Sequence, residues 1–327
     1  MKKIWMPLIA VVPLACAGAG SDQSEQVLAA EQGFPEGNPG TDQVLIGFTD
    51  EQPTSPSDIG AFRTFCEYSH MSHDDPIVFP GHPGASHLHT FFGNTGTDAS
   101  STYSSLRNSG NSTCRGGIAN RSAYWIPTLL DESQQPMVPS WSSFYYKQGY
   151  NIADSHAINH IPDGLRMVAG SSSKTAPTGD PGIAYWGCLN NYVGHHEGIV
   201  DCEVGDAMEL TVVFPQCWNG VDLDSPDHRS HMAYPEDGAC PASHPIALPE
   251  ISINVAWTRN ENTIVGLLKL SSDGYDTARQ PPGLSVHADW FDGWDPAIKN
   301  TFVDHCLQPR VDCHSHLLGD GRELLGL

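Results

Sequence analysis

The chain has 327 residues, and its 38 acidic side chains against 16 basic ones give a formal charge of −22 at pH 7. Such a charge repels a phosphate backbone, so we expect no nucleic-acid partner. Only 17% of the residues are charged, while 32 glycines and 25 prolines indicate many turns between short strands and argue against a helical bundle.

The N-terminus has the pattern of an export signal. Two lysines precede a mainly apolar run over residues 4–15 and a small-residue cleavage context around Cys16, which predicts a signal peptide over 1–16 rather than a membrane span. The run before Cys16 also resembles a bacterial lipobox, so we favour a lipoprotein at the outer surface or in the periplasm, held at a membrane only through its lipid anchor. The alternative is cleavage after Ala17 and simple secretion.

The rest of the chain reads as one domain behind a tether. Residues 17–44 are rich in Gly, Ser, Gln and Glu without hydrophobic periodicity, which predicts a flexible tether. No linker-like composition interrupts residues 45–316, which we expect to form a single globular domain. Residues 317–327 are expected to be a frayed tail.

Alternating apolar and polar residues predict half-buried strands over 208–214 and 251–257. Residues 164–169 and 264–270 are two further strand candidates. Short strands between clusters of Gly, Pro, Asn and Asp predict a mainly β fold. We expect a single disulfide-stapled domain of the β-sandwich or jelly-roll type, with long loops.

One helix is predicted near the C-terminus. Asp295 has the properties of an N-cap, and Pro296 suits the first helical position. Ile298, Phe302 and Cys306 then recur at the spacing of one helix face. The predicted helix covers about 295–306.

Eight cysteines remain after Cys16. In an exported protein an even number predicts disulfides, and the chain lacks the C-x-x-C spacing of a zinc ribbon or a thioredoxin-type centre. We pair sequence neighbours as the simplest arrangement: Cys66–Cys114, Cys188–Cys202, Cys217–Cys240 and Cys306–Cys313.

The main chemical signal is a set of histidines at chelating spacings. We take as candidate metal ligands His87, His89, His228, His231 and His287. Imidazole suits zinc and copper, whereas calcium at nearby aspartates is the less favoured choice. The alternative is that each histidine hydrogen-bonds to its own loop and stabilises it.

Two aspartates beside these histidines are candidate catalytic groups. Asp227 precedes His228, and Asp289 follows His287 by two residues. Either could act as a base or orient an imidazole. The alternative for Asp227 is turn capping, because its loop is rich in Asp, Ser and Pro.

The motifs of serine hydrolases, zincin proteases and nucleotide-binding enzymes do not occur in the chain. Aromatic residues near the histidine loops could instead stack against sugar rings, and the alternative is that half or more of them are core or turn residues. These are Tyr124, Trp125, Trp218, Trp290 and Trp294.

Several long motifs taken together resemble the family catalogued as domain of unknown function 1996, which occurs in secreted fungal and bacterial proteins. The resemblance covers roughly residues 60–306 and implies export, but it implies no particular reaction. All five candidate histidines and both aspartates lie in its motifs. The motifs are HDDPIVFPGHPGASHLHTFFGN (73–94), RSAYWIPTLLD (121–131), PDGLRMVAG (162–170), FPQCWNGVDLDSPDHRSHMAYP (214–235), CPASHPIALPEI (240–251) and HADWFDGWD (287–295).

Two hypotheses for function follow. The first is an exported metal-dependent enzyme that acts on an extracellular polysaccharide or another envelope polymer. The second is a non-catalytic surface protein that binds carbohydrate or metal through the same residues. A catalyst needs a metal with an open coordination position, whereas a binder does not.

Overall fold

The computed structural model describes Met1 and residues 33–55, 58–148 and 158–326. The folded body extends from Pro35 onward. The predicted signal peptide and residues 17–32 of the predicted tether lie outside the described residues. Within the described part of the chain, no helix has the length and apolar character needed to cross a membrane.

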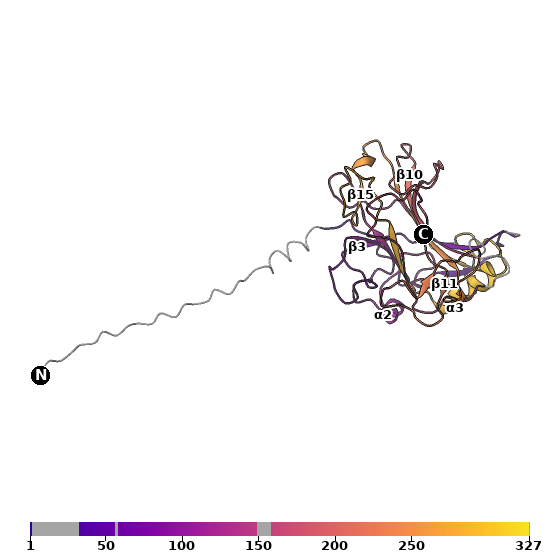
Figure 1. The fold of residues 1–327 in the computed structure, drawn as a ribbon. Helices are drawn as coiled ribbons and strands as arrows, with labels where there is room; N and C mark the ends of the chain where they lie inside the picture. The colour runs from indigo at the N-terminus through magenta and orange to yellow at the C-terminus, as the bar shows by residue number, and fades with distance from the viewer. Residues whose placement is uncertain (2–32, 56–57, 149–157, 327) are drawn as a thin grey trace. The chain divides into compact units, whose positions relative to one another are not determined.

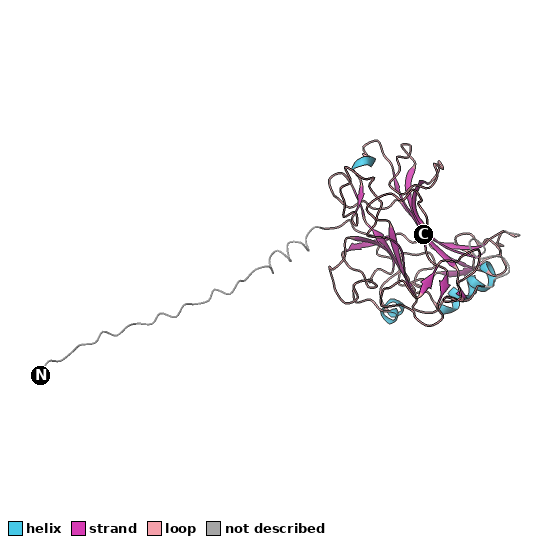
Figure 2. Cartoon of the chain, in the orientation of Figure 1, coloured by secondary structure: helices cyan, strands magenta, loops and turns pink. Residues whose placement is uncertain are grey.

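Two five-stranded antiparallel sheets form the body, and strands far outnumber helices (Figures 1 and 2). The order of the first sheet is β2 (Gly60–Thr64), β7 (Trp141–Gln148), β14 (Glu250–Thr258), β10 (Ala207–Val213) and β9 (Ala184–Cys188). The order of the second is β3 (Tyr68–Ser72), β4 (His89–Gly93), β5 (Ala123–Pro127), β16 (His287–Phe291) and β8 (Arg166–Gly170).

Three strand predictions are confirmed. The alternating segments 208–214 and 251–257 correspond to β10 and β14, which pair with each other so that Leu210 lies opposite Val255. Segment 164–169 corresponds to β8. The predicted mainly β fold with a C-terminal helix is therefore confirmed.

The main core lies between the two sheets. Phe92 of the second sheet contacts Phe144 of the first, with ring centroids 5.6 Å apart. The hydroxyls of Tyr124 and Tyr146 hydrogen-bond across the same interface at 2.8 Å. Because side chains alternate along a strand, the neighbouring residues of the second sheet face away from this core.

This outer face of the second sheet carries a core of its own. Phe91, Trp125 and Val168 cover it, and Ile77 from a loop and Leu106 from a helix pack on them. A sheet face covered by loops can bury polar groups far from the main core. The candidate site lies on this face.

Shorter elements complete the fold. They are β1 (Ile46–Phe48) with β17 (Arg322–Leu324), β12 (Met232–Ala233) with β11 (Cys217–Trp218) and β13 (Ile246–Ala247), β15 (Lys269–Leu270) with β6 (Leu129–Leu130), and the helical segments α2 (Tyr103–Asn108), η1 (Val265–Leu267), α3 (Pro296–Phe302) and η2 (Val303–Leu307).

The C-terminal helix begins as predicted. The Asp295 side chain accepts hydrogen bonds from the backbone N–H groups of Ala297 and Ile298, and Pro296 is the first helical residue. The α-helix ends at Phe302 and continues as the π-helical turn η2. The sequence analysis missed α2, because six residues are too few for a helical period to be recognised.

Three expectations were wrong. Segment 264–270 is not one strand but a 3-10 turn followed by the two residues of β15, because its apolar run does not alternate and the turn buries Val265 and Leu268. The C-terminal residues do not fray, since β17 pairs with β1 and Leu324 is buried. Residues 35–44 of the expected tether belong to the body, where the backbone N–H of Asn38 donates to the carbonyl of Tyr68 at 2.9 Å.

Four disulfides join the cysteines in the neighbour pairing: Cys66–Cys114, Cys188–Cys202, Cys217–Cys240 and Cys306–Cys313. Such bridges persist in oxidising compartments. The disulfides therefore indicate an extracellular protein.

Candidate metal centre

Strand pairing brings two of the candidate ligands to the same face of the second sheet, one on each side of β5. His89, the first residue of β4, lies opposite Pro127 of β5. Asp289 of β16 lies opposite Trp125 of β5, so His287, two residues earlier in this antiparallel strand, is level with Pro127 on its other side. Residues directly opposite each other share a face, so both imidazoles project from the outer face of the second sheet.

His87 completes a triad with these two histidines. Its Nε2 lies 3.1 Å from the Nε2 of His287, and its ring centroid lies 4.3 Å from that of His89. One ligand nitrogen from each of the three lies within 4.8 Å of the others. Two nitrogens on one tetrahedral zinc or copper ion are about 3.3 Å apart, given metal–nitrogen bonds of about 2.0–2.1 Å. The triad therefore has the spacing of a metal site.

Backbone carbonyls orient two of the rings. The Nδ1 of His89 donates to the carbonyl of Asp74 at 3.0 Å, and the Nδ1 of His287 donates to the carbonyl of Ser285 at 2.9 Å. A neutral ring that donates through Nδ1 carries its lone pair on Nε2, and ligating histidines are usually held in this way. The Nε2 of His89 is buried and has no hydrogen-bond partner among the described residues.

The surroundings keep the three rings neutral. Burial, with the neighbouring His287 adding to it, lowers the pKa of His87 to about 3. Burial and the adjacent His89 lower the pKa of His287 to about 3 as well. Burial places the pKa of His89 well below its usual value. Neutral imidazole is the form that binds a metal ion.

Two carboxylates lie close to His89. A second group of possible ligand atoms, also within 4.8 Å of one another, comes from Asp75, His89 and Asp289. One oxygen of Asp75 accepts hydrogen bonds from the N–H groups of Ile77 and Val78 at 2.9 and 2.8 Å. Both oxygens of Asp289 are buried and have no hydrogen-bond partner among the described residues.

Burial is also the main influence on these carboxyl groups. It raises the pKa of Asp289 well above its usual value, and the nearby charge of Asp75 adds to the effect. Burial raises the pKa of Asp75 too, although the hydrogen bonds from the backbone N–H groups stabilise the charged form and partly offset this effect. Sequence reasoning did not select Asp75 for the site, because an aspartate before Pro76 has the pattern of an ordinary turn.

The metal centre lies within the part of the chain that matches a family model. That model is described as Domain of unknown function (DUF1996), and it matches residues 75–294. The chain belongs to the DUF1996 family. This confirms the resemblance found in the sequence, and the triad and both buried aspartates lie inside the matched region. The comparisons found no matching curated protein and no matching solved structure.

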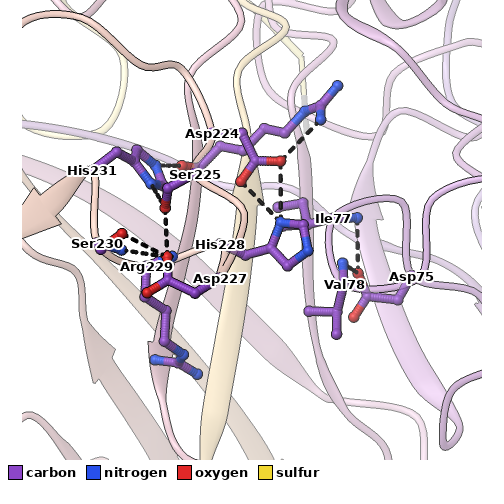
Figure 3. A network of polar contacts seen from close by, with 11 residues as sticks. Asp75, Ile77, Val78, Asp224, Ser225, Asp227, His228, Arg229, Ser230 and His231 are labelled. Atoms are coloured by element: carbon purple, nitrogen blue, oxygen red, sulfur yellow. Dashed lines mark hydrogen bonds and ion pairs between the residues drawn. The ribbon is translucent and has the colours of Figure 1, made fainter.

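The other two candidate ligands of the DUF1996 domain belong to neither group of ligand atoms, and Figure 3 shows the contacts that they make instead. His231 donates through Nε2 to the carbonyl of Arg166 at 2.7 Å, and its Nδ1 contacts the Ser225 hydroxyl at 2.9 Å. The Nδ1 of His228 lies 3.0 and 3.1 Å from the two oxygens of Asp224. Both rings therefore brace the 224–231 loop, as the alternative reading of the histidines predicted.

His228 nevertheless lies near the metal centre. Figure 3 shows its ring between the Asp224 carboxylate and the Ile77–Val78 segment capped by Asp75. The Asp224 carboxylate is held in turn by Arg166 at 3.1 Å. An aspartate that holds one nitrogen of an imidazole is a common way to orient a proton-transfer group.

Asp227 lies outside both groups of ligand atoms. It is exposed, and one of its oxygens accepts hydrogen bonds from the backbone N–H of Ser230 at 2.9 Å and from the hydroxyls of Ser225 and Ser230 at 2.7 Å. These hydrogen bonds, that from the Ser230 backbone foremost, lower its pKa. The geometry is that of the turn cap given as the alternative for this residue.

The aromatic residues considered for sugar stacking are mostly inaccessible. Tyr124, Trp125, Trp290 and Trp294 are completely buried, and Trp218 is half-buried. Their positions on strands explain the difference, since each faces a core rather than solvent. Four of the five are therefore core residues, which confirms the alternative given for them.

A cavity of about 350 Å³ lies between the edge strands of the two sheets. It is lined by Val168 and Gly170 of β8 and by Ala184 of β9, with Lys174 and Arg229 as its cations. Val168 and Gly170 lie opposite Asp289 and His287 in the β8–β16 pairing. The cavity therefore lies one strand away from the metal centre.

Proposed function

We propose that this DUF1996 protein is an exported metal-dependent enzyme. Zinc or copper is held by His87, His89 and His287. The observation that carries the proposal is the alignment of His89 and His287, whose Nδ1 atoms donate to backbone carbonyls and leave each Nε2 for a ligand. Such a metal would supply Lewis-acid chemistry or activate a bound water.

The number of ligands favours a catalytic over a structural ion. Three protein ligands leave a coordination position for water or substrate, whereas structural zinc usually has four. His87 is only partly buried, which leaves an approach to the ion. Four disulfides already stabilise the fold, which makes a purely structural role for the metal less favoured. Of the two aspartates expected to be catalytic, Asp289 belongs to the group around His89.

The substrate that we propose is an extracellular polysaccharide or another envelope polymer. Export supports this proposal, as does the cavity beside β8. We also propose that a lipid on Cys16 anchors the protein. Mass spectrometry of the exported protein would detect that acyl group.

The alternative is a non-catalytic protein that binds metal or carbohydrate. The burial of His89 and His287 favours this alternative, because an enclosed ion exchanges slowly and is poorly accessible to a polymer. Comparing polymer cleavage by the metal-loaded and the chelated protein separates the two functions. Cleavage that disappears on chelation and returns with metal supports the enzyme, and metal binding without cleavage across a panel of envelope polymers supports the alternative.

The metal site itself is tested by calorimetric titration. The chelated protein is titrated with Zn²⁺ and Cu²⁺, and His87→Gln and His287→Gln should each weaken binding at this site by at least about 100-fold. The control is His82→Gln, since His82 is exposed in the same loop and outside the ligand group. Binding by the His287→Gln protein as tight as by the wild type would refute the proposed site.

A further inference from the structure

We propose that Asp75 and Asp289 bind a second divalent cation beside the histidine-bound metal, so that the protein holds a two-metal centre. This inference rests on the proposed function, because His89 belongs to both groups of ligand atoms. The second ion is bound by carboxylate oxygens and water, and the first by imidazole nitrogens.

The first observation that supports the second ion is that Asp289 is buried and lacks hydrogen-bond partners among the described residues. Its side chain is 1% exposed, and neither oxygen has a hydrogen-bond partner among the described residues. Asp75, 3% exposed, offers a carboxylate oxygen within 4.8 Å of one from Asp289. Two buried carboxylates at this separation repel each other and are costly to bury unless a proton or a cation compensates them.

Asp292 is a nearby buried carboxylate whose charge is neutralised by another side chain of the protein. Asp292 is fully buried three residues after Asp289, and the ammonium group of the fully buried Lys299 lies 2.7 Å from it. Asp292 also accepts a hydrogen bond from the backbone N–H of Gly164. Nothing equivalent is found near Asp289 in the described residues.

Arg229 is the cation whose charge acts on Asp289, but it does not neutralise it by contact. It lowers the pKa of Asp289 only as a third influence, after burial and Asp75. Its guanidinium donates to the carbonyl of Val168 at 3.3 Å, and the residue is exposed. No ion pair joins Arg229 to a carboxylate in the part of the chain that the structure describes.

The second observation is that His89 belongs to both groups of ligand atoms, which places the two carboxylates next to the triad. This ring is completely buried, and its Nε2 has no hydrogen-bond partner among the described residues. The ring offers a ligand atom within 4.8 Å of those of Asp75 and Asp289, and also one within 4.8 Å of those of His87 and His287. One Nε2 lone pair serves one metal ion, so His89 stays with the triad and the second ion takes the carboxylate oxygens. Two-metal sites usually hold their ions about 3.5–4 Å apart, and the residue that the two groups share makes them neighbours.

The mixed ligand set indicates the class of the second ion. Carboxylate oxygens and water suit zinc, manganese or magnesium. Calcium needs six to eight oxygen ligands, more than Asp75 and Asp289 can supply. Zinc can occupy both positions, which makes it the probe of choice.

The experiment counts zinc in the full-length protein. Chelated protein is loaded with excess Zn²⁺, desalted and analysed by elemental mass spectrometry. We expect two zinc ions per wild-type chain, and one in Asp289→Asn, Asp75→Asn and His287→Gln. The control Asp227→Asn should retain two, since Asp227 is an exposed turn cap. Circular dichroism checks that each variant folds, and the use of two aspartate variants covers the case in which one does not.

Cobalt then identifies which ion is lost. Co²⁺ at the triad gives a visible spectrum of nitrogen ligation, which should persist in Asp289→Asn and Asp75→Asn and disappear in His287→Gln. One zinc in both the wild type and Asp289→Asn, with none in His287→Gln, would overturn the second site and leave the proposed function intact. One zinc in the wild type that is lost in Asp289→Asn but kept in His287→Gln would overturn both proposals.

Discussion

The Nε2 atoms of His87 and His287 lie 3.1 Å apart although 200 positions separate these residues in the chain. Because the Nδ1 of neutral His287 donates its hydrogen to a carbonyl, the Nε2 of this ring carries a lone pair on the side of His87. The fold holds this arrangement by burying His287 and by tying its Nδ1 to the carbonyl of Ser285. This spacing is compatible with a metal ion bound to both nitrogens.

The first prediction concerns acid stability of the metal-free protein. The folded-state pKa values of His87 and His287 are about 3, below the usual value of 6.5. The unfolded chain therefore binds these protons at higher pH than the folded protein, and stability present above about pH 6.5 is lost as the pH falls toward 3. Each histidine contributes a slope of up to about 1.4 kcal/mol per pH unit in this window.

Urea unfolding in chelator, repeated between pH 7 and pH 4, measures that slope. His287→Gln should flatten it, whereas His82→Gln should leave it unchanged. The buried carboxyl of Asp289 titrates in the opposite sense, but it is present in all three proteins and does not explain a difference between them. Equal slopes in the wild type and His287→Gln would contradict the prediction.

The second prediction concerns the buried ion pair of Lys299 and Asp292, whose charged atoms lie 2.7 Å apart. Lys299→Met should lower the free energy of unfolding by about 3–5 kcal/mol, because it leaves Asp292 charged, buried and unpaired. The double variant Lys299→Met/Asp292→Asn should recover part of the loss. Chemical denaturation of the three proteins tests this, and a single variant no less stable than the double one would argue against the pair.

The third prediction concerns the C-terminal strand. Leu324 is 2% exposed and Leu325 is 42% exposed. Leu324→Ala should therefore cost about 2–4 kcal/mol of stability, since it empties a packed position, and Leu325→Ala should cost much less. Thermal unfolding of this adjacent pair provides its own control. Equal and small effects would show that the end of the chain frays after all.

The fourth prediction concerns the disulfides. Alkylation followed by mass spectrometry of the exported protein should find no free thiol among the eight cysteines of the body. Replacing Cys188 and Cys202 together by serine opens a bridge between residues 14 positions apart and should cost about 3 kcal/mol. Two or more free thiols in the native protein would contradict the bridges.

Local patterns in the sequence were enough to determine several elements. The alternation over 208–214 and 251–257 predicts β10 and β14, because a period of two places one face of a strand in the core. The cap at Asp295 predicts the start of α3, because the N–H groups from which its side chain accepts hydrogen bonds lie within the next three residues. The H-x-H spacing of His87 and His89 likewise described a real pair.

Only the tertiary structure decided which distant residues meet that pair. His287 joins it because β5 lies between β4 and β16, and strand order across a sheet leaves no trace in the local period. The H-x-x-H pair of His228 and His231 has an equally good spacing, but its loop directs the rings to Asp224 and to a backbone carbonyl. Spacing specifies neighbours within a turn or a strand. Long-range pairing and the burial that it creates determine whether a polar side chain becomes a ligand or a brace for its own loop.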